Sequence, residues 1–157
     1  MSKYKLTLFF IAVLAFVTDQ LSKFYIVYVR QMYEGQFVPV IEPLFNLKYV
    51  KNFGINFGLL NGNMEVSRWL LTLVTSAIVI GVLFWIMNKL TFRIAVLGGL
   101  VVGGALGNIF DRIYHGAVID FINNSWWGFV NPFSYNLADI WIFIGIFGLI
   151  IWGPKEE

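Results

Sequence analysis

The chain has 157 residues, of which 59% are hydrophobic and 13% are charged, and its formal net charge is +2. Because soluble domains carry about 25% charged residues, this composition indicates an integral membrane protein, and its length suits one compact domain. The small net charge argues against a nucleic-acid partner. The sequence contains no cysteine, which excludes disulfides, thiolate nucleophiles and cysteine–metal sites.

Four hydrophobic segments predict four transmembrane helices, at about residues 6–29, 69–87, 94–110 and 137–152. A spanning helix needs about 20 apolar residues. The last segment is shorter, so it spans the membrane only if Asp139, in its first turn, lies at the membrane surface. Lysines and arginines near both termini and in the short link at 88–93 fall on one side, and the positive-inside rule makes that side, with both termini, cytoplasmic.

The two connections on the opposite, outer side are long. In the first, at about residues 30–68, the stretches 37–41 and 44–50 have the composition and alternation of strands, which predicts a small sheet at the membrane surface. The predicted fold class is therefore an all-α membrane protein with four transmembrane helices and a small extracytoplasmic β-sheet cradle. All of it belongs to one domain over residues 1–157.

The chain has only four aspartates, and this topology brings all of them to the outer side of the membrane. Carboxylates at membrane depth are costly and are usually kept for function or for pairing. Asp19 and Lys23 are four residues apart on the first helix, in the acid-first order that favours an ion pair. Asp111 follows the outer end of the third segment.

Asp120 and Asp139 form the candidate catalytic pair. Asp120 lies in the second outer connection, and Asp139 opens the last helix, where the helix dipole alone would also favour a carboxylate. If the two carboxylates meet, one of them keeps its proton. The charged member then takes a proton from water while the protonated member polarises a carbonyl, which hydrolyses an amide. The sequence therefore predicts an aspartic peptidase with an active-site loop at about residues 111–136.

Other catalytic designs fit the sequence poorly. Ser22 and Lys23 are adjacent, so on a helix their side chains point about 100° apart and do not form a dyad. His115 is the only histidine, which leaves no histidine-based metal site. We therefore expect neither a metal nor a cofactor.

Five segments of the chain, taken in order, resemble the lipoprotein signal peptidases, the bacterial type II signal peptidases. These segments are DQLSK (19–23), VKNFGINFG (50–58), GALGNIFDR (104–112), VIDF (118–121) and YNLAD (135–139). The resemblance covers essentially the whole chain and implies a four-helix aspartic peptidase of the bacterial inner membrane, with its active site toward the outer face. Such an enzyme removes the signal peptide from diacylglyceryl-modified prolipoproteins by cleaving before the lipid-modified cysteine.

The resemblance also implies roles for individual residues. It makes Asp120 and Asp139 catalytic. Positions that line the site in the family are Asn52, Gly54, Asn108, Arg112, Asn136 and Ala138, and positions of structural support are Asp19, Lys23 and Asp111. The implied partners are the prolipoprotein signal peptide, membrane lipids and cyclic peptide inhibitors such as globomycin, and we expect a monomer. Asn56 and Tyr135 stand where the family generally has alanine and phenylalanine.

Two other functions stay open on the sequence. A small proton-coupled transporter could use the aspartates as a relay, although transport sites tend to lie near the bilayer midplane. The third segment has a glycine at every fourth residue, at Gly99, Gly103 and Gly107. A non-catalytic scaffold could bind a partner helix on this face. Aromatic residues between the two candidate acids would form either an interfacial anchor or a lid over the site; they are Trp126, Trp127, Phe129 and Phe133.

Overall fold

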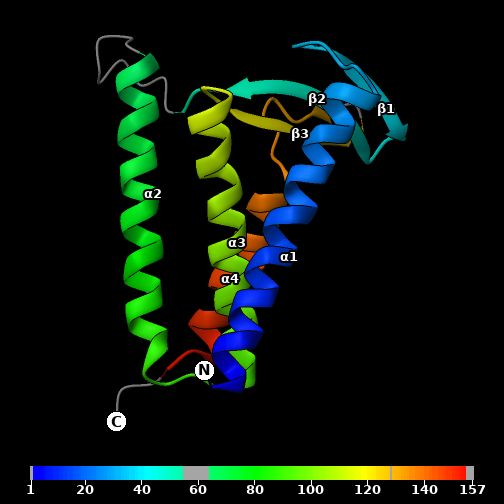
Figure 1. Cartoon of the computed structure of the whole chain (residues 1–157). Helices are drawn as coiled ribbons and strands as arrows, with labels where there is room; N and C mark the ends of the chain where they lie inside the picture. Colours follow the sequence, from blue (N-terminus) through cyan, green and yellow to red (C-terminus); the bar gives the residue numbers. More distant parts are fainter. Residues whose placement is uncertain (1, 55–63, 128, 155–157) are drawn as a thin grey trace.

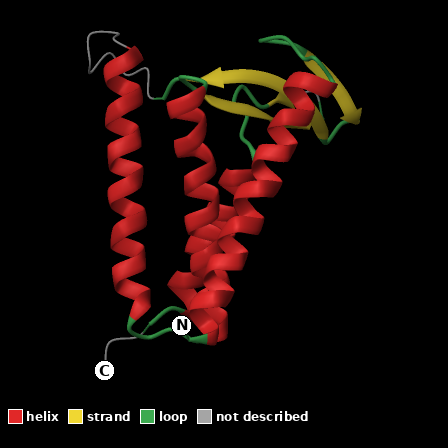
Figure 2. Cartoon of the chain, viewed as in Figure 1, coloured by secondary structure: helices red, strands yellow, loops and turns green. Residues whose placement is uncertain are grey.

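The computed structural model describes residues 2–54, 64–127 and 129–154. It consists of a helical bundle with a small β-sheet at one end (Figure 1 and Figure 2). The helices are α1 (Lys3–Phe24), which a π-helical turn continues over Tyr25–Val29, α2 (Met64–Met87), α3 (Phe92–Tyr114) and α4 (Leu137–Trp152). The strands are β1 (Phe37–Ile41), β2 (Phe45–Asn52), β3 (Val118–Trp126) and β4 (Phe129–Val130). Helices α1 and α3 run toward the sheet, and α2 and α4 run away from it.

Three of the predicted spans are confirmed as helices that are long and apolar enough to cross a membrane. They cover Lys3–Val29, Met64–Met87 and Phe92–Tyr114. Helix α4 is apolar but has 16 residues, which is about 24 Å at ~1.5 Å per residue, against a hydrocarbon core of about 30 Å. The fourth span therefore stays a prediction.

Helix α3 continues past residue 110, where the sequence predicted its end. No glycine or proline interrupts the chain until Gly116, which adopts a φ of +78°. Asp111 and Arg112, predicted at the start of the outer connection, therefore lie near the end of α3 instead. The connection between α3 and α4 is correspondingly shorter than predicted, and much of it is strand.

Helix α3 is the central helix of the bundle, and it packs mainly between α1 and α4. Small residues permit this contact. A Cβ at Gly103 would overlap the Ala12 carbonyl oxygen of α1, and one at Gly104 would lie 2.6 Å from the Ala138 carbonyl oxygen of α4. The other glycines of the predicted repeat, Gly99 and Gly107, also face α1. The predicted close helix contact is confirmed, whereas α2 stands apart from α1 in Figure 1.

The sheet is antiparallel, with strand order β1-β2-β3-β4. The two strands predicted from the sequence are confirmed as β1 and β2. Strand β3 was not predicted, because polar residues such as Asp120 and Asn123 break the apolar alternation of its sequence. In the observed register Val50 of β2 lies opposite Asp120, and Asn52 lies opposite Val118, which brings the end of β2 beside the candidate acid.

A cluster of buried apolar side chains fastens the sheet to the bundle. Ile26 and Met32, from the segment after α1, pack with Tyr49 of β2. Ile119 and Phe121 of β3 complete the cluster. Strand β3 is therefore held over the C-terminal end of α1 by packing as well as by its backbone hydrogen bonds to β2.

The contact between α1 and α3 predicts that Gly103→Ala destabilises the bundle, because a new Cβ has no room beside Ala12. Overpacking of this kind costs about 1–3 kcal/mol. Gly81→Ala is the matched control, since nothing lies within 4 Å of a Cβ at Gly81. Thermal unfolding in detergent should show a lower midpoint for Gly103→Ala alone, and equal midpoints for the two variants would contradict this packing.

Candidate active site

Asp120 is buried in β3, with 3% of its surface exposed. Its Oδ2 accepts a hydrogen bond from Asn52 Nδ2 at 2.9 Å, and its Oδ1 accepts one from Asn136 Nδ2 at 2.7 Å. Burial raises the pKa of Asp120 to about 7; the two amide donors oppose this rise, and the charge of Asp139 adds to it. The carboxyl group of Asp120 therefore keeps its proton up to about neutral pH.

Asp139 is half-buried in the first turn of α4. It forms a capping box with Asn136, in which Asp139 N donates to Asn136 Oδ1 and Asn136 N donates to Asp139 Oδ2, both at 3.1 Å. The other carboxylate oxygen, Oδ1, accepts a hydrogen bond from Asn108 Nδ2 of α3 at 2.9 Å. The favourable place in the first helical turn that the sequence suggested is confirmed, the capping box is an addition that the structure reveals, and Asp139 is also bonded to a second helix.

Asn136 joins the two acids. Its side-chain amide donates to Asp120, and its backbone N–H donates to Asp139. Asn136 is fully buried, so these contacts are held by the interior of the protein. The charge of Asp139 is one of the causes that raise the pKa of Asp120, so the two carboxylates bound to Asn136 lie close enough for their charges to interact.

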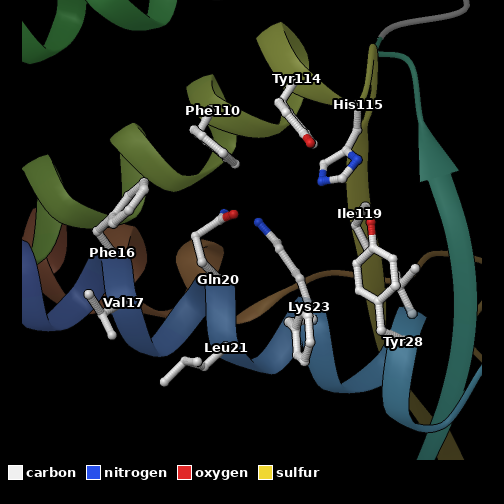
Figure 3. Close-up of a pocket in the computed structure, with 12 residues that line it drawn as sticks. Phe16, Val17, Gln20, Leu21, Lys23, Tyr28, Phe110, Tyr114, His115 and Ile119 are labelled. Atoms are coloured by element: carbon white, nitrogen blue, oxygen red, sulfur yellow. The ribbon is translucent and has the colours of Figure 1, made fainter.

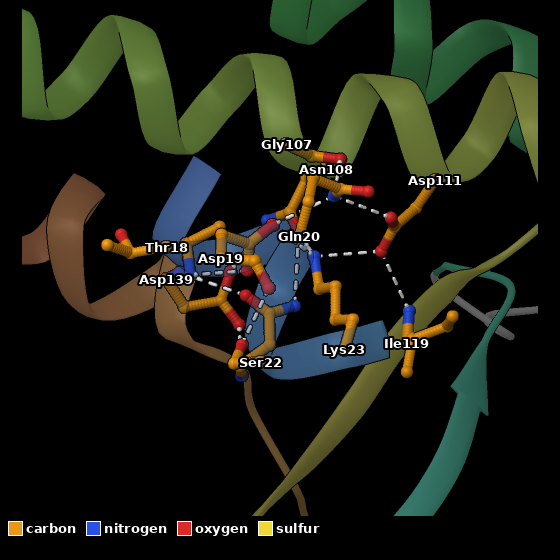
Figure 4. A network of polar contacts seen from close by, with 12 residues as sticks. Thr18, Asp19, Gln20, Ser22, Lys23, Gly107, Asn108, Asp111, Ile119 and Asp139 are labelled. Atoms are coloured by element: carbon orange, nitrogen blue, oxygen red, sulfur yellow. Dashed lines mark hydrogen bonds and ion pairs between the residues drawn. The ribbon is translucent and has the colours of Figure 1, made fainter. Parts of the chain in front are cut away.

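A buried cluster of three charged groups, Asp19, Lys23 and Asp111, lies near Asp139 (Figure 4). Lys23 Nζ is 2.7 Å from Asp19 Oδ2 and 2.8 Å from Asp111 Oδ2. The predicted Asp19–Lys23 ion pair is confirmed, and Asp111 is a second partner that the sequence did not reveal. Asp19 Oδ1 also accepts a hydrogen bond from Ala138 N at 3.0 Å, so the cluster joins α1, α3 and the start of α4.

A groove of about 680 Å³ opens beside Asp120. Of the six residues that the resemblance places around the substrate, Asn52, Gly54 and Arg112 line this groove. Asn108, Asn136 and Ala138 do not line it; they are buried and bonded to other groups of the site. A second groove of about 380 Å³ runs along α4 from Asp139, and its other lining residues are apolar. The acidic pair thus lies between the groove beside Asp120, which polar and apolar side chains line together, and the apolar groove along α4.

A third cavity, of about 480 Å³, lies between α1 and α3 (Figure 3). It contains His115, and in Figure 3 the polar ends of Gln20 and Lys23 point toward one another at its wall. Neither member of the acidic pair lines it. Ser22 donates its hydroxyl to the Asp19 carbonyl oxygen at 2.6 Å, and the ammonium of Lys23 is held by carboxylates, in agreement with the absence of a Ser–Lys dyad.

The aromatic side chains Trp126, Trp127, Phe129 and Phe133 are all strongly exposed. Of the four, only Phe133 lines the groove beside Asp120. Asn123 Nδ2 donates to the carbonyl oxygens of Asn131 and Phe133, both at 2.8 Å. The sequence does not single out Asn123, because nothing in its neighbourhood distinguishes it from other loop asparagines. Asn56 lies outside the described residues.

Comparison with known proteins gives one consistent result. A family model described as signal peptidase (SPase) II matches residues 11–153. The lipoprotein signal peptidase of Shewanella piezotolerans is 39% identical over 145 residues, which cover 91% of this chain and 82% of that protein. The lipoprotein signal peptidase of Alteromonas mediterranea is 36% identical over 147 residues, covering 90% and 76%.

Two solved structures, each described as a bacterial membrane enzyme, share the fold. One superposes with a TM-score of 0.79 at 28% sequence identity, covering 96% of this chain and 94% of its own. The other has a TM-score of 0.75 at 29% identity, covering 96% and 93%. The arrangement of helices and sheet is thus shared with membrane enzymes over nearly the full length.

The buried cluster predicts that Lys23→Met lowers stability strongly. Breaking a buried ion pair from one side costs about 3–5 kcal/mol, because two carboxylates then remain without a counter-charge. Lys5→Met, which removes an exposed lysine from the same helix, serves as the control. The unfolding midpoint in detergent should fall for Lys23→Met and stay near wild type for Lys5→Met, and a similar change in both would show that the cluster has no stabilising role.

Proposed function

This chain belongs to the signal peptidase II family, and we propose that it is an aspartic endopeptidase that removes the signal peptide from diacylglyceryl-modified prolipoproteins, cleaving before the lipid-modified cysteine. The observation that carries the proposal is the contact of both Asp120 and Asp139 with Asn136. The relatives from Shewanella and Alteromonas are lipoprotein signal peptidases. A peptidase therefore accounts for the acids better than a proton-coupled transporter or a non-catalytic scaffold.

Hydrolysis by this pair needs one protonated and one charged carboxylate. Burial favours Asp120 as the protonated member, which leaves Asp139 as the base. Asp139 takes a proton from water as the water oxygen attacks the scissile carbonyl carbon, and Asp120 gives its proton to the carbonyl oxygen. When the tetrahedral diol collapses, one hydroxyl returns a proton to Asp120, Asp139 protonates the leaving nitrogen, and the C–N bond breaks.

The two grooves suit a substrate that is part peptide and part membrane helix. We propose that the groove beside Asp120 faces outward, and we call it the outer groove. The extended segment around the scissile bond would lie in it, where Asn52, Gly54 and Arg112 bind it. The guanidinium of Arg112 would stabilise negative charge on the attacked carbonyl oxygen. The apolar groove that begins at Asp139 would take hydrophobic residues of the signal peptide. Globomycin-like cyclic peptides would inhibit by occupying the outer groove.

We propose a role in orientation for the three predicted site residues that are buried. Asn108 and Asn136 hold the carboxylates, and Ala138 joins α4 to Asp19. The structural-support positions Asp19, Lys23 and Asp111 hold the helices together. The single domain would lie in the bacterial inner membrane as a monomer, with α4 as a fourth span, both termini cytoplasmic and the sheet on the outer face.

Asp120→Asn and Asp139→Asn should each lower cleavage of a diacylglyceryl-modified precursor by at least about 100-fold, the usual scale for loss of a general acid or base. Both changes keep the size of the side chain, so the unfolding midpoint reports whether the fold survives. Glu34→Gln, at an exposed carboxylate, should cleave like the wild type. Cleavage at the wild-type rate by either aspartate variant would exclude this mechanism.

The rate of cleavage should fall as pH rises through about 7. Asp120 must hold a proton to polarise the carbonyl, and that proton is lost as pH passes its pKa of about 7. The alkaline limb of the kcat/KM profile of the purified protein measures this ionisation in the free enzyme. A rate that stays constant well above neutral pH would mean that Asp120 is not the acid.

A further inference from the structure

Lys23 makes one hydrogen bond that its ion pairs do not explain. Two of its three ammonium N–H groups are taken by Asp19 and Asp111. The third donates to Asn108 Oδ1 at 3.2 Å, although Asn108 carries no charge. Only 2% of Lys23 is exposed, so this N–H group bonds inside the protein, to a residue that also contacts Asp139.

We propose that Lys23 is a positioning residue for the acidic pair, which holds the Asn108 amide in the one orientation that makes Asp139 the charged member. This inference deepens the proposed function and rests on it. Lys23 would thus affect the chemistry at Asp139, although the two side chains are not bonded to each other directly.

The orientation of the Asn108 amide follows from its neighbours. Its Oδ1 lies 3.2 Å from Lys23 Nζ and 3.1 Å from Asn136 Nδ2. Both of these groups are donors only, so the oxygen must face them. The NH₂ group then faces Asp139 Oδ1, at 2.9 Å. Rotating the amide by half a turn would set its NH₂ against two donors and its oxygen against a carboxylate.

An amide N–H held in this way stabilises the charged form of Asp139. The backbone N–H of Asn136 and the N-terminal end of α4 act in the same direction. Asp120, the other acid, is more deeply buried and receives its donors from neutral amides alone. The negative charge of the pair therefore belongs on Asp139.

Other charged groups surround the pair, and none of them replaces the amide. They are Asp19 and Lys23 from α1, Asp111 and Arg112 from α3, and Lys51 from β2 at the outer groove. The charge of Lys23 is already matched by two carboxylates. Its effect on Asp139 therefore passes through the orientation of Asn108 more than through space.

The test compares the pH profile of kcat for three variants on a lipid-modified precursor. Asn108→Leu removes the amide. Lys23→Met combined with Asp19→Asn removes the lysine while keeping the net charge of the cluster. Gln20→Leu is the matched control, because Gln20 Nε2 donates to Asp19 and Asp111 but has no bond to Asn108.

We expect the acid limb of the profile to move to higher pH by about one unit in Asn108→Leu and in the double variant, because a hydrogen bond to a charged group is lost. In both, kcat should fall more than KM changes. The acid limb of Gln20→Leu should stay at the wild-type position, even if its unfolding midpoint falls.

An acid limb that stays in place in Asn108→Leu or in the double variant would overturn the inference, as would an equal shift in Gln20→Leu. A different observation would disprove the proposed function: the wild-type protein would not cleave the precursor. If one variant does not fold, the other still decides the question, since each removes the positioning bond at a different end.

Discussion

Lys23 lies between Asp19 and Asp111 inside the bundle, and the rest of the structure depends on this arrangement. An isolated charge within a membrane is costly, so these three groups stay buried only while they remain together. Their pairing draws α1 against α3, and the hydrogen bond from Ala138 N to Asp19 adds the start of α4. Gly107 is part of the same constraint, because a Cβ there would overlap the Asp19 carboxylate.

The proposed catalytic pair is assembled on this cluster from three directions. Asn108 reaches Asp139 from α3, one turn before Asp111. Strand β3 carries Asp120, and the apolar packing of Ile119 and Phe121 holds that strand over the helices. Asn136 closes the arrangement as the N-cap of α4. Asn136 therefore both caps α4 and orients Asp120. A change at this residue would affect the stability of α4 and the geometry of the pair together.

The long helices and the strands at 37–41 and 44–50 could be predicted, because long apolar runs in lipid have to form helices and alternating residues favour strands. Strand β3 could not, since its polar side chains bond to groups outside the strand: Asp120 accepts from Asn136, and the amide N–H groups of Asn123 donate to carbonyl oxygens such as that of Phe133. The family resemblance predicted that Asn108 and Asn136 belong to the site. It could not predict that both are buried and bonded to the carboxylates and do not line the groove. The second partner of Lys23, Asp111, could not be predicted, because it reaches Lys23 from a helical turn of α3 that continues past residue 110.

The central claim is that a buried proton on Asp120 accompanies a negative charge on Asp139. The chain has only four aspartates, so carbon-13 NMR of aspartate-labelled protein in micelles can follow each carboxyl carbon separately during a pH titration. One carboxyl should titrate near pH 7, and its signal should be absent from Asp120→Asn. An Asp120 carboxyl that is already fully ionised at about pH 5, as an ordinary exposed aspartate would be, would contradict the claim.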